Sequence, residues 1–148
     1  MYSLFLKIYI NQPKAEDLSS IWENPASLLE KADKIKTLKV IKKEKNRLYT
    51  RWEVDIEGAI LSWYEEDILD RERGLINFKM RSGDFGDFFG YWKIVPTRWG
   101  KLRLEFKVNY DWGIPVLEPY VKRVLEKKAR VMWKSFLQAV KQALESNG

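Results

Sequence analysis

Residues 48–69 read LYTRWEVDIEGAILSWYEEDIL and carry the strongest structural signal in the chain. Apolar and polar side chains alternate on both sides of Glu57-Gly58, which is typical of two strands joined by a two-residue hairpin turn. The turn places Ile56 opposite Ala59. Because side chains alternate along a strand, this pairing sets the register of every residue outward from the turn. The stretch is therefore predicted to form one antiparallel hairpin.

The same register decides which side chains share a face of the hairpin. Trp52 faces Trp63, and Thr50 faces Glu65, on the more apolar side, which we expect to turn toward a C-terminal helix. Glu65 and Asp67 are then two inward carboxylates, about 7 Å apart along one strand. Burying an ionised carboxylate without a partner is costly. Three alternatives follow: a wet cavity, pairing with Lys or Arg, or a strand end that projects beyond the core.

The rest of the chain shows two further periodicities, one of strands and one of helices. Alternation predicts seven strands in all, at residues 2–10, 35–43, 48–57, 59–69, 75–81, 88–95 and 102–111. Helical spacing predicts short helices at 14–22 and 26–31 and a long amphipathic helix at 116–146. Short links make the strands from residue 35 onward antiparallel neighbours. No repeat or linker interrupts the pattern, so residues 1–148 are predicted to form a single α+β domain.

Aromatic side chains continue the inner face in the last two strands. Phe88 and Trp92 flank Gly90, and a glycine in mid-strand predicts a bend or a close approach by another group. We therefore expect a curled sheet with the long helix across its mouth. The space between them either holds a ligand or is filled by rings such as Trp133 and Phe136 as ordinary core.

The amino-acid composition limits which catalytic groups and metal sites the protein can have. The 148 residues include 27 Lys and Arg, 21 Asp and Glu, no Cys and no His, for a net charge of +6. This excludes disulfides, thiol nucleophiles, imidazole bases and zinc sites built from Cys and His. We expect no metal and no cofactor. No apolar run approaches the roughly 20 residues of a membrane span, and the lack of Cys suits a reducing compartment, so we expect a cytoplasmic protein. The oligomeric state is left open.

Several motifs carry a resemblance to a known family. They are Leu61-Ser62-Trp63 followed by Glu66 and Leu69-Asp70, then Gly83-Asp84-Phe85-Gly86-Asp87-Phe88-Phe89-Gly90-Tyr91-Trp92, and finally Gly113-Ile114-Pro115 before the last helix. With the order of elements, they make the chain resemble the polyketide cyclase/dehydrase branch of the START-like superfamily, also called SRPBCC or birch-pollen-allergen-like. The coenzyme-Q-binding and ribosome-associating toxin proteins are a sibling branch that shares the glycine-aromatic strand.

The resemblance implies a helix-grip fold. In this fold a seven-stranded antiparallel sheet curls around a long C-terminal helix, two short helices follow the first strand, and a pocket holds polyketides, quinones, sterols or other lipids. The aromatase/cyclases of the family carry an inward serine and an inward arginine at the positions held here by Glu65 and Asp67. Because the cationic donor is replaced by an acid, aromatase activity of the same kind is not expected.

The leading hypothesis is binding of a hydrophobic small molecule, of polyketide, quinone or lipid type, between the sheet and the C-terminal helix. The predicted ligand-binding residues are Thr50, Trp52, Trp63, Phe88, Trp92, Tyr110, Met132 and Phe136. Glu65 and Asp67 are candidate catalytic residues. Desolvation among tryptophans raises the pKa of a carboxyl group, which suits a general acid or base in cyclisation or dehydration.

An alternative from another class is a protein or RNA interaction module, for example on the ribosome. It would use the basic face of the last helix and a basic segment before the hairpin. These residues are Lys122, Arg123, Lys127, Lys128, Arg130, Lys134 and Lys141, with Lys42, Lys43 and Lys45. Acidic residues are interleaved with the basic ones along the chain. The charge is therefore expected to serve solvation, and a nucleic-acid partner is not expected.

Overall fold

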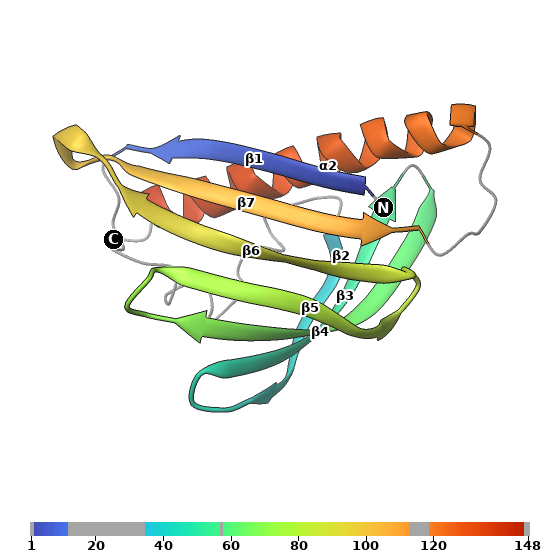
Figure 1. Ribbon diagram of the computed structural model, residues 1–148, viewed down its shortest axis with the longest axis horizontal. Coiled ribbons are helices and arrows are strands. Elements are labelled where there is room, and N and C mark those ends of the chain that lie inside the picture. Colours follow the sequence, from blue (N-terminus) through green and yellow to red (C-terminus); the bar gives the residue numbers. More distant parts are fainter. Residues whose placement is uncertain (1, 12–34, 57, 113–118, 147–148) are drawn as a thin grey trace.

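The computed structural model describes residues 2–11, 35–56, 58–112 and 119–146, which form a curled sheet and a long helix (Figure 1). The elements are β1 (Tyr2–Ile10), β2 (Ile35–Lys43), β3 (Arg47–Ile56), β4 (Ala59–Asp70), β5 (Leu75–Gly83), β6 (Asp87–Pro96), the 3-10 turn η2 (Arg98–Gly100), β7 (Leu102–Asp111) and α2 (Pro119–Ser146). The strand order is β1-β7-β6-β5-β4-β3-β2, with every pair antiparallel. The predicted seven-stranded antiparallel sheet with a C-terminal helix is confirmed.

The hairpin between β3 and β4 has the predicted register. Ile56 pairs with Ala59, and Trp52 pairs with Trp63. Gly58 in the turn has φ of +90°, a left-handed conformation that side chains other than glycine adopt at a cost. The turn therefore fixes which residues of both strands face inward.

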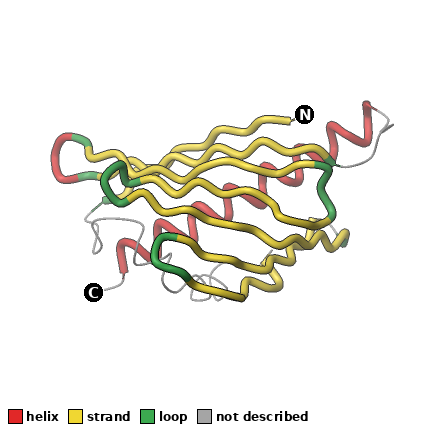
Figure 2. Tube along the Cα trace, turned by 60° about the horizontal axis from the view of Figure 1, so that its bottom comes forward, coloured by secondary structure: helices red, strands yellow, loops and turns green. Residues whose placement is uncertain are grey.

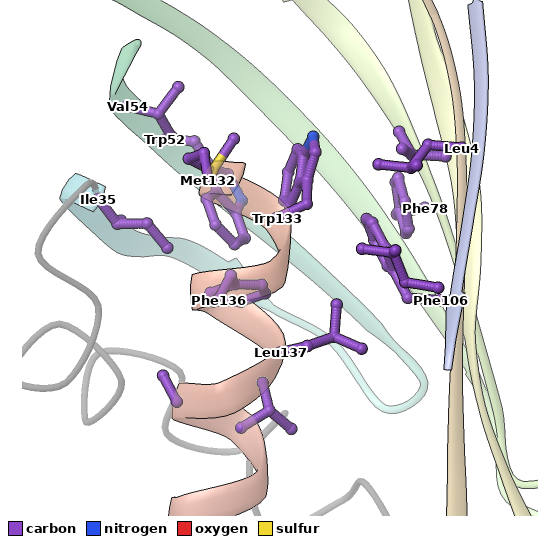
Figure 3. Packing of buried hydrophobic residues seen from close by; sticks show 14 of the residues in the cluster. Leu4, Ile35, Trp52, Val54, Phe78, Phe106, Met132, Trp133, Phe136 and Leu137 are labelled. Atoms are coloured by element: carbon purple, nitrogen blue, oxygen red, sulfur yellow. The ribbon is translucent and has the colours of Figure 1, made fainter. Parts of the chain in front are cut away.

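The helix α2 lies across the concave side of the sheet (Figures 1 and 2). It packs against β1 at one edge and against β3 next to the other edge, so the sheet grips it from both sides. Its buried stripe comprises Ala129, Met132, Trp133, Phe136, Leu137, Ala139 and Val140. Figure 3 shows Leu137 pointing from α2 toward Phe106 of β7. Burying each large apolar side chain stabilises the fold by about 1.5–3 kcal/mol.

Gly90 of β6 confirms the predicted close approach. A Cβ atom there would collide with the carbonyl oxygen of Lys107 on β7, and it would lie 2.8 Å from Cζ of Phe78. The missing side chain thus lets the neighbouring strand and an inner aromatic ring come together. The strand continues through this position without a break.

The remaining predictions concern the helices and turns of the chain. The turn η2 was not predicted, because three residues give no periodicity. The described part of the long helix is α2, Pro119–Ser146, and residues 116–118 of the prediction lie outside the described residues. The predicted short helices at 14–22 and 26–31 lie outside the described residues. Within the part of the chain that the structure describes, no helix has both the length and the apolar composition that crossing a membrane requires.

Candidate functional site

Trp52 and Trp63 form the centre of the inner aromatic wall. Their rings are stacked, with centroids 5.5 Å apart and planes inclined by 6°. Phe136 of α2 meets Trp52 edge-on at 5.5 Å and Trp92 at 5.3 Å. Met132 is buried in the same cluster. Sheet and helix are therefore in direct contact along this part of the wall.

Of the remaining predicted aromatic residues, Phe88 joins this wall directly and Tyr110 joins it through Phe85. Phe88 packs on Trp63 at 4.8 Å, and Phe85 lies 4.9 Å from Phe88 and 5.8 Å from Tyr110. Sequence reasoning missed Phe85 because it precedes the alternating run of β6, where no periodicity marks it as inward. The predicted ligand-binding rings thus share one connected surface. Along these contacts the rings themselves occupy the space as core.

Beyond the stacked tryptophans, the inner face becomes polar. Glu65 and Asp67 are only 5% and 8% exposed. Trp63 Nε1 donates a hydrogen bond to Glu65 Oε1 at 3.0 Å, and Trp52 Nε1 donates to Thr50 Oγ1 at 2.9 Å. Thr50 and Glu65 are opposite each other in the β3–β4 register. Both indole N–H groups therefore point toward the polar end of the wall.

The two carboxyl groups of this polar end form an acid pair, and the pKa of each is raised above its usual value. Burial raises the pKa of Glu65, although hydrogen bonds from Asp67 and from the indoles partly oppose the rise. Burial raises the pKa of Asp67 well above its usual range, and the neighbouring charges, first that of Glu65, add to the shift. Asp67 therefore holds its proton more tightly and donates it in a hydrogen bond to the Glu65 carboxylate.

This acid pair lacks a cationic partner among the described residues. The buried Oδ1 of Asp67 has no hydrogen-bond partner there either. A projecting strand end is the wrong alternative, because both side chains are buried. An unpartnered buried polar oxygen costs about 1–3 kcal/mol. The same part of the chain holds no group of three or more His, Cys, Asp or Glu that could bind a metal.

Glu66, between the two acids in sequence, points to the opposite face and is nevertheless only 3% exposed. Arg47 Nη1 contacts its Oε1 at 3.2 Å, and Arg81 Nη1 contacts its Oε2 at 3.1 Å. Arg81 is the extra residue of a β-bulge, because Tyr64 pairs with Ser82 and Glu65 pairs with Met80. Alternation predicts that Glu66 points outward, but nothing in the sequence marks the bulge that covers it.

Two grooves combine tyrosine rings with basic side chains, and neither was predicted. One, of about 440 Å³, is lined by Ile41, Lys42, Tyr49, Thr50, Tyr64, Glu65 and Arg81. The other, of about 630 Å³, is lined by Tyr9, Asn11, Thr97, Arg98, Lys101 and Arg103. Most of these side chains alternate away from the buried face of the sheet. The first groove nevertheless reaches Thr50 and Glu65 of the polar end, whereas none of the residues lining the second belongs to the aromatic wall.

The predicted basic face of α2 is largely present. Exposed residues on it are Arg123, Lys127, Arg130 and Lys134. Lys141 differs, because its Nζ donates to the carbonyl oxygen of Tyr9 at 2.7 Å and pairs with Glu145 at 2.7 Å. The hydrogen bond from Lys141 thus connects the C-terminal part of α2 to β1.

Comparison with known proteins identifies related sequences and folds. Residues 14–137 match the sequence model of a family described as polyketide cyclase/dehydrase and lipid transport. No curated protein sequence matches significantly. A protein of Thermus thermophilus has a TM-score of 0.87 at 22% identity, with 97% of each chain covered. An aromatase/cyclase from Streptomyces has a TM-score of 0.78 at 14% identity, covering 99% of this chain and 98% of that one. A START superfamily protein from Mycobacterium smegmatis has a TM-score of 0.76 at 17% identity, covering 99% of both chains.

Proposed function

The chain belongs to the polyketide cyclase/dehydrase and lipid transport family, and on that premise we propose that it binds an apolar small molecule between the sheet and α2. The ligand is of polyketide, quinone or lipid type. Because Phe136 of α2 packs directly on Trp52 and Trp92, the ligand must separate these rings for its apolar body to contact Trp52, Trp63 and the predicted rings around them. Its polar tip meets the acid pair, Glu65 and Asp67, and the hydroxyl of Thr50.

The acid pair is the observation that carries this proposal. An apolar core of similar volume would be more stable than one that contains two carboxyl groups without a cation. Asp67 Oδ1 lacks a donor among the described residues. A ligand hydroxyl would supply it, and a hydrogen bond to this neutral carboxyl oxygen contributes about 0.5–1.5 kcal/mol.

The charge of the pair also selects the ligand tip. Glu65 keeps a negative charge, and the proton of Asp67 is already engaged in the hydrogen bond to Glu65, so both groups favour an incoming donor. A neutral hydroxyl, as in a phenol, an enol or an alcohol, fits this requirement. A carboxylate tip would meet like charge and is disfavoured.

The acid pair also supports a second candidate function, general acid–base catalysis of an aldol cyclisation or a dehydration. The Glu65 carboxylate would accept a proton from a carbon next to a carbonyl, and the Asp67 carboxyl group would return one to the leaving oxygen. Glu65→Gln should then abolish conversion of a β-hydroxyketone to its enone, followed by ultraviolet absorbance, with ligand binding largely kept. Equal turnover in both proteins would dismiss catalysis and leave binding in place.

The binding proposal is tested by native mass spectrometry of the purified protein and by tryptophan fluorescence titration. The probes are a trihydroxyanthraquinone, unsubstituted anthraquinone and palmitate. We expect the hydroxylated probe to bind at least about tenfold more tightly than the unsubstituted one, which corresponds to about 1.4 kcal/mol.

Asp67→Leu should remove that preference, while Leu69→Met, a buried apolar exchange on the same strand, should keep it. The absence of any copurified ligand, together with the absence of saturable binding of all three probes, would contradict the proposal.

A further inference from the structure

We propose that the convex face of the sheet is a binding platform for single-stranded nucleic acid. This activity goes beyond the ligand-binding function and does not depend on it. The platform lies on β1, β5, β6 and β7. It consists of the rings of Phe5, Phe89 and Tyr91 and the ammonium groups of Lys7, Lys79, Lys93 and Lys107, and we call this set the convex platform.

Strand register interleaves the rings and the lysines. Phe5 of β1 pairs with Lys107 of β7, which in turn pairs with Tyr91 of β6. Phe89, two residues before Tyr91 on the same face, pairs with Lys79 of β5. Each ring therefore has a lysine directly beside it on a neighbouring strand.

The rings are accessible in the middle of their strands. Phe5 is 47% exposed and Phe89 is 39% exposed, although the residues that flank them in sequence, such as Leu4 and Phe88, are buried in the core. Tyr91 is partly exposed. These rings are therefore accessible from solvent, as a stacking platform requires.

The lysines of the platform are available for phosphate groups. In the portion of the chain that is described, none of the four forms an ion pair within 4.0 Å. Glu105 lies opposite Lys7 and Lys93 in register, but its carboxylate is bonded to Arg103 Nε at 2.8 Å. Glu66 lies opposite Lys79 but is bound by Arg47 and Arg81, whereas Asp87 and Asp111 lie beside Phe89 at the end of the platform. Basic charge is therefore in excess around Phe5 and Tyr91, where it complements a phosphate backbone.

The spacing suits unstacked bases. Rings on alternate residues of one strand are about 7 Å apart, and neighbouring strands are about 4.8 Å apart. Both distances exceed the rise of about 3.4 Å between bases stacked in a duplex. Bases splayed from a single strand can each stack on a ring, while the phosphates follow the lysines between the rings.

Both grooves continue this chemistry beyond the platform. Tyr9 lies on the same face of β1 as Phe5 and belongs to the groove with Arg98, Lys101 and Arg103. On the other side, Tyr49 and Tyr64 share a groove with Lys42 and Arg81. Rings beside cations therefore extend over much of the convex face, with Lys42, Arg81 and Arg103 ion-paired to Glu44, Glu66 and Glu105. Its charges are scattered and interleaved with acids along the sequence, which is why sequence reasoning expected no nucleic-acid partner.

Other occupants fit the convex platform less well. A second copy of the chain would bring lysines against lysines. An anionic membrane would satisfy the lysines, but rings held in the middle of a rigid sheet cannot insert as protruding side chains do. Double-stranded DNA or RNA hides its base faces from the rings. Single-stranded nucleic acid can contact both the rings and the lysines of the platform.

The test is fluorescence anisotropy of the full chain with fluorescein-labelled 20-mers of uridine and thymidine, starting at about 50 mM salt. Two paired variants address the platform: Phe5→Ser with Phe89→Ser, and Lys79→Glu with Lys107→Glu. The control pair, Arg130→Glu with Lys134→Glu, makes the same charge change on exposed residues of α2. Circular dichroism and thermal unfolding establish that each variant is folded.

We expect each platform variant to weaken binding at least tenfold and the α2 control to change it less than threefold. The lysine variant should also reduce the slope of log K against log salt by about 1.4, the value for two single-strand phosphate contacts. Any of four results would overturn the proposal: no binding by the wild type, equal weakening by the α2 control, equally tight binding of a duplex, or binding to phosphatidylserine vesicles without binding to the oligonucleotides.

Discussion

Trp63 Nε1 lies 3.0 Å from Glu65 Oε1, two residues along one face of β4, so the indole that stacks on Trp52 also donates a hydrogen bond to a buried acid. Stacking fixes the plane of the indole and therefore the direction of its N–H group. That donor stabilises the charged form of Glu65, which in turn accepts the proton of Asp67. The geometry of the aromatic wall and the charge of the acid pair are thus coupled.

Trp63→Phe should separate the two roles of this indole. A smaller aromatic ring remains, but the N–H donor to Glu65 is lost, so the pKa of Glu65 rises further. Because the donor favours the charged form, its loss should cost more stability at pH 8 than at pH 5, with a total of about 1–2 kcal/mol at pH 8. Urea unfolding at the two pH values measures the difference. Trp133→Phe, which does not touch Glu65, should cost the same at both, and a similar result for Trp63→Phe would contradict the assigned hydrogen bond.

Asp67→Asn should change how stability depends on pH. The raised pKa means that the folded protein holds a proton that the unfolded chain has released above about pH 4, the ordinary range for aspartate. The unfolded state then binds fewer protons, so the free energy of unfolding falls as pH rises, by up to about 1.4 kcal/mol per pH unit and per proton.

Asn cannot titrate, so the Asp67→Asn variant should lose less stability than the wild type between about pH 4 and neutrality. Chemical unfolding across this range measures both profiles. Glu72→Gln, on the exposed β4–β5 turn, controls for the loss of a carboxylate elsewhere. Superimposable profiles of wild type and Asp67→Asn would show that Asp67 is not protonated in the folded state.

Gly90→Ala and Gly58→Ala should lower the stability of the fold by different amounts. A steric clash opposes the first substitution, and a left-handed backbone conformation opposes the second. The new Cβ at Gly90 meets the backbone of Lys107, which cannot move without disrupting the β6–β7 pairing, so we expect a loss of about 3 kcal/mol or more. Gly58 has open space around it but a φ of +90°, so Gly58→Ala should cost only about 1–2 kcal/mol. Urea unfolding at neutral pH gives both values, and the reverse order would contradict the close packing at Gly90.

Local patterns were sufficient to predict the sheet and the inward face. The Glu57-Gly58 turn and strict alternation gave the pairing of Trp52 with Trp63, because both depend only on residues adjacent in sequence. The close approach at Gly90 followed in the same way, since a glycine inside an apolar strand leaves room that a neighbouring strand or ring can occupy. The acid pair was also predictable, as it lies two residues apart on one strand of known register.

Features that depend on several strands could not be predicted. The burial of Glu66 requires a β-bulge that aims Arg81 at it and the start of β3 that supplies Arg47. No residue pattern in β5 marks that bulge. Phe85 joins the aromatic wall from a segment without periodicity, so its role depends on tertiary contacts that only the folded chain provides.

Glu66, Arg47 and Arg81 form an ion triad. Removing its carboxylate should cost less stability than removing its two arginines. The Glu66 side chain is 4% exposed, whereas Arg47 and Arg81 are 51% and 56% exposed. In Glu66→Gln the two arginines can turn to water, so the cost should be only about 1–2 kcal/mol. Arg47→Gln combined with Arg81→Gln leaves a buried carboxylate without a cation, so the loss should reach about 3 kcal/mol or more.

Urea unfolding of these variants at neutral pH tests the asymmetry, and adding Glu66→Gln to the arginine pair should restore part of the stability, because the uncompensated charge is then gone. Glu53→Gln, which breaks the more exposed Arg51–Glu53 pair, is the matched control and should change stability by less than about 1 kcal/mol. The arginines would not compensate for burial of the Glu66 charge if their double variant were no less stable than Glu66→Gln. The same would follow if the triple variant recovered no stability.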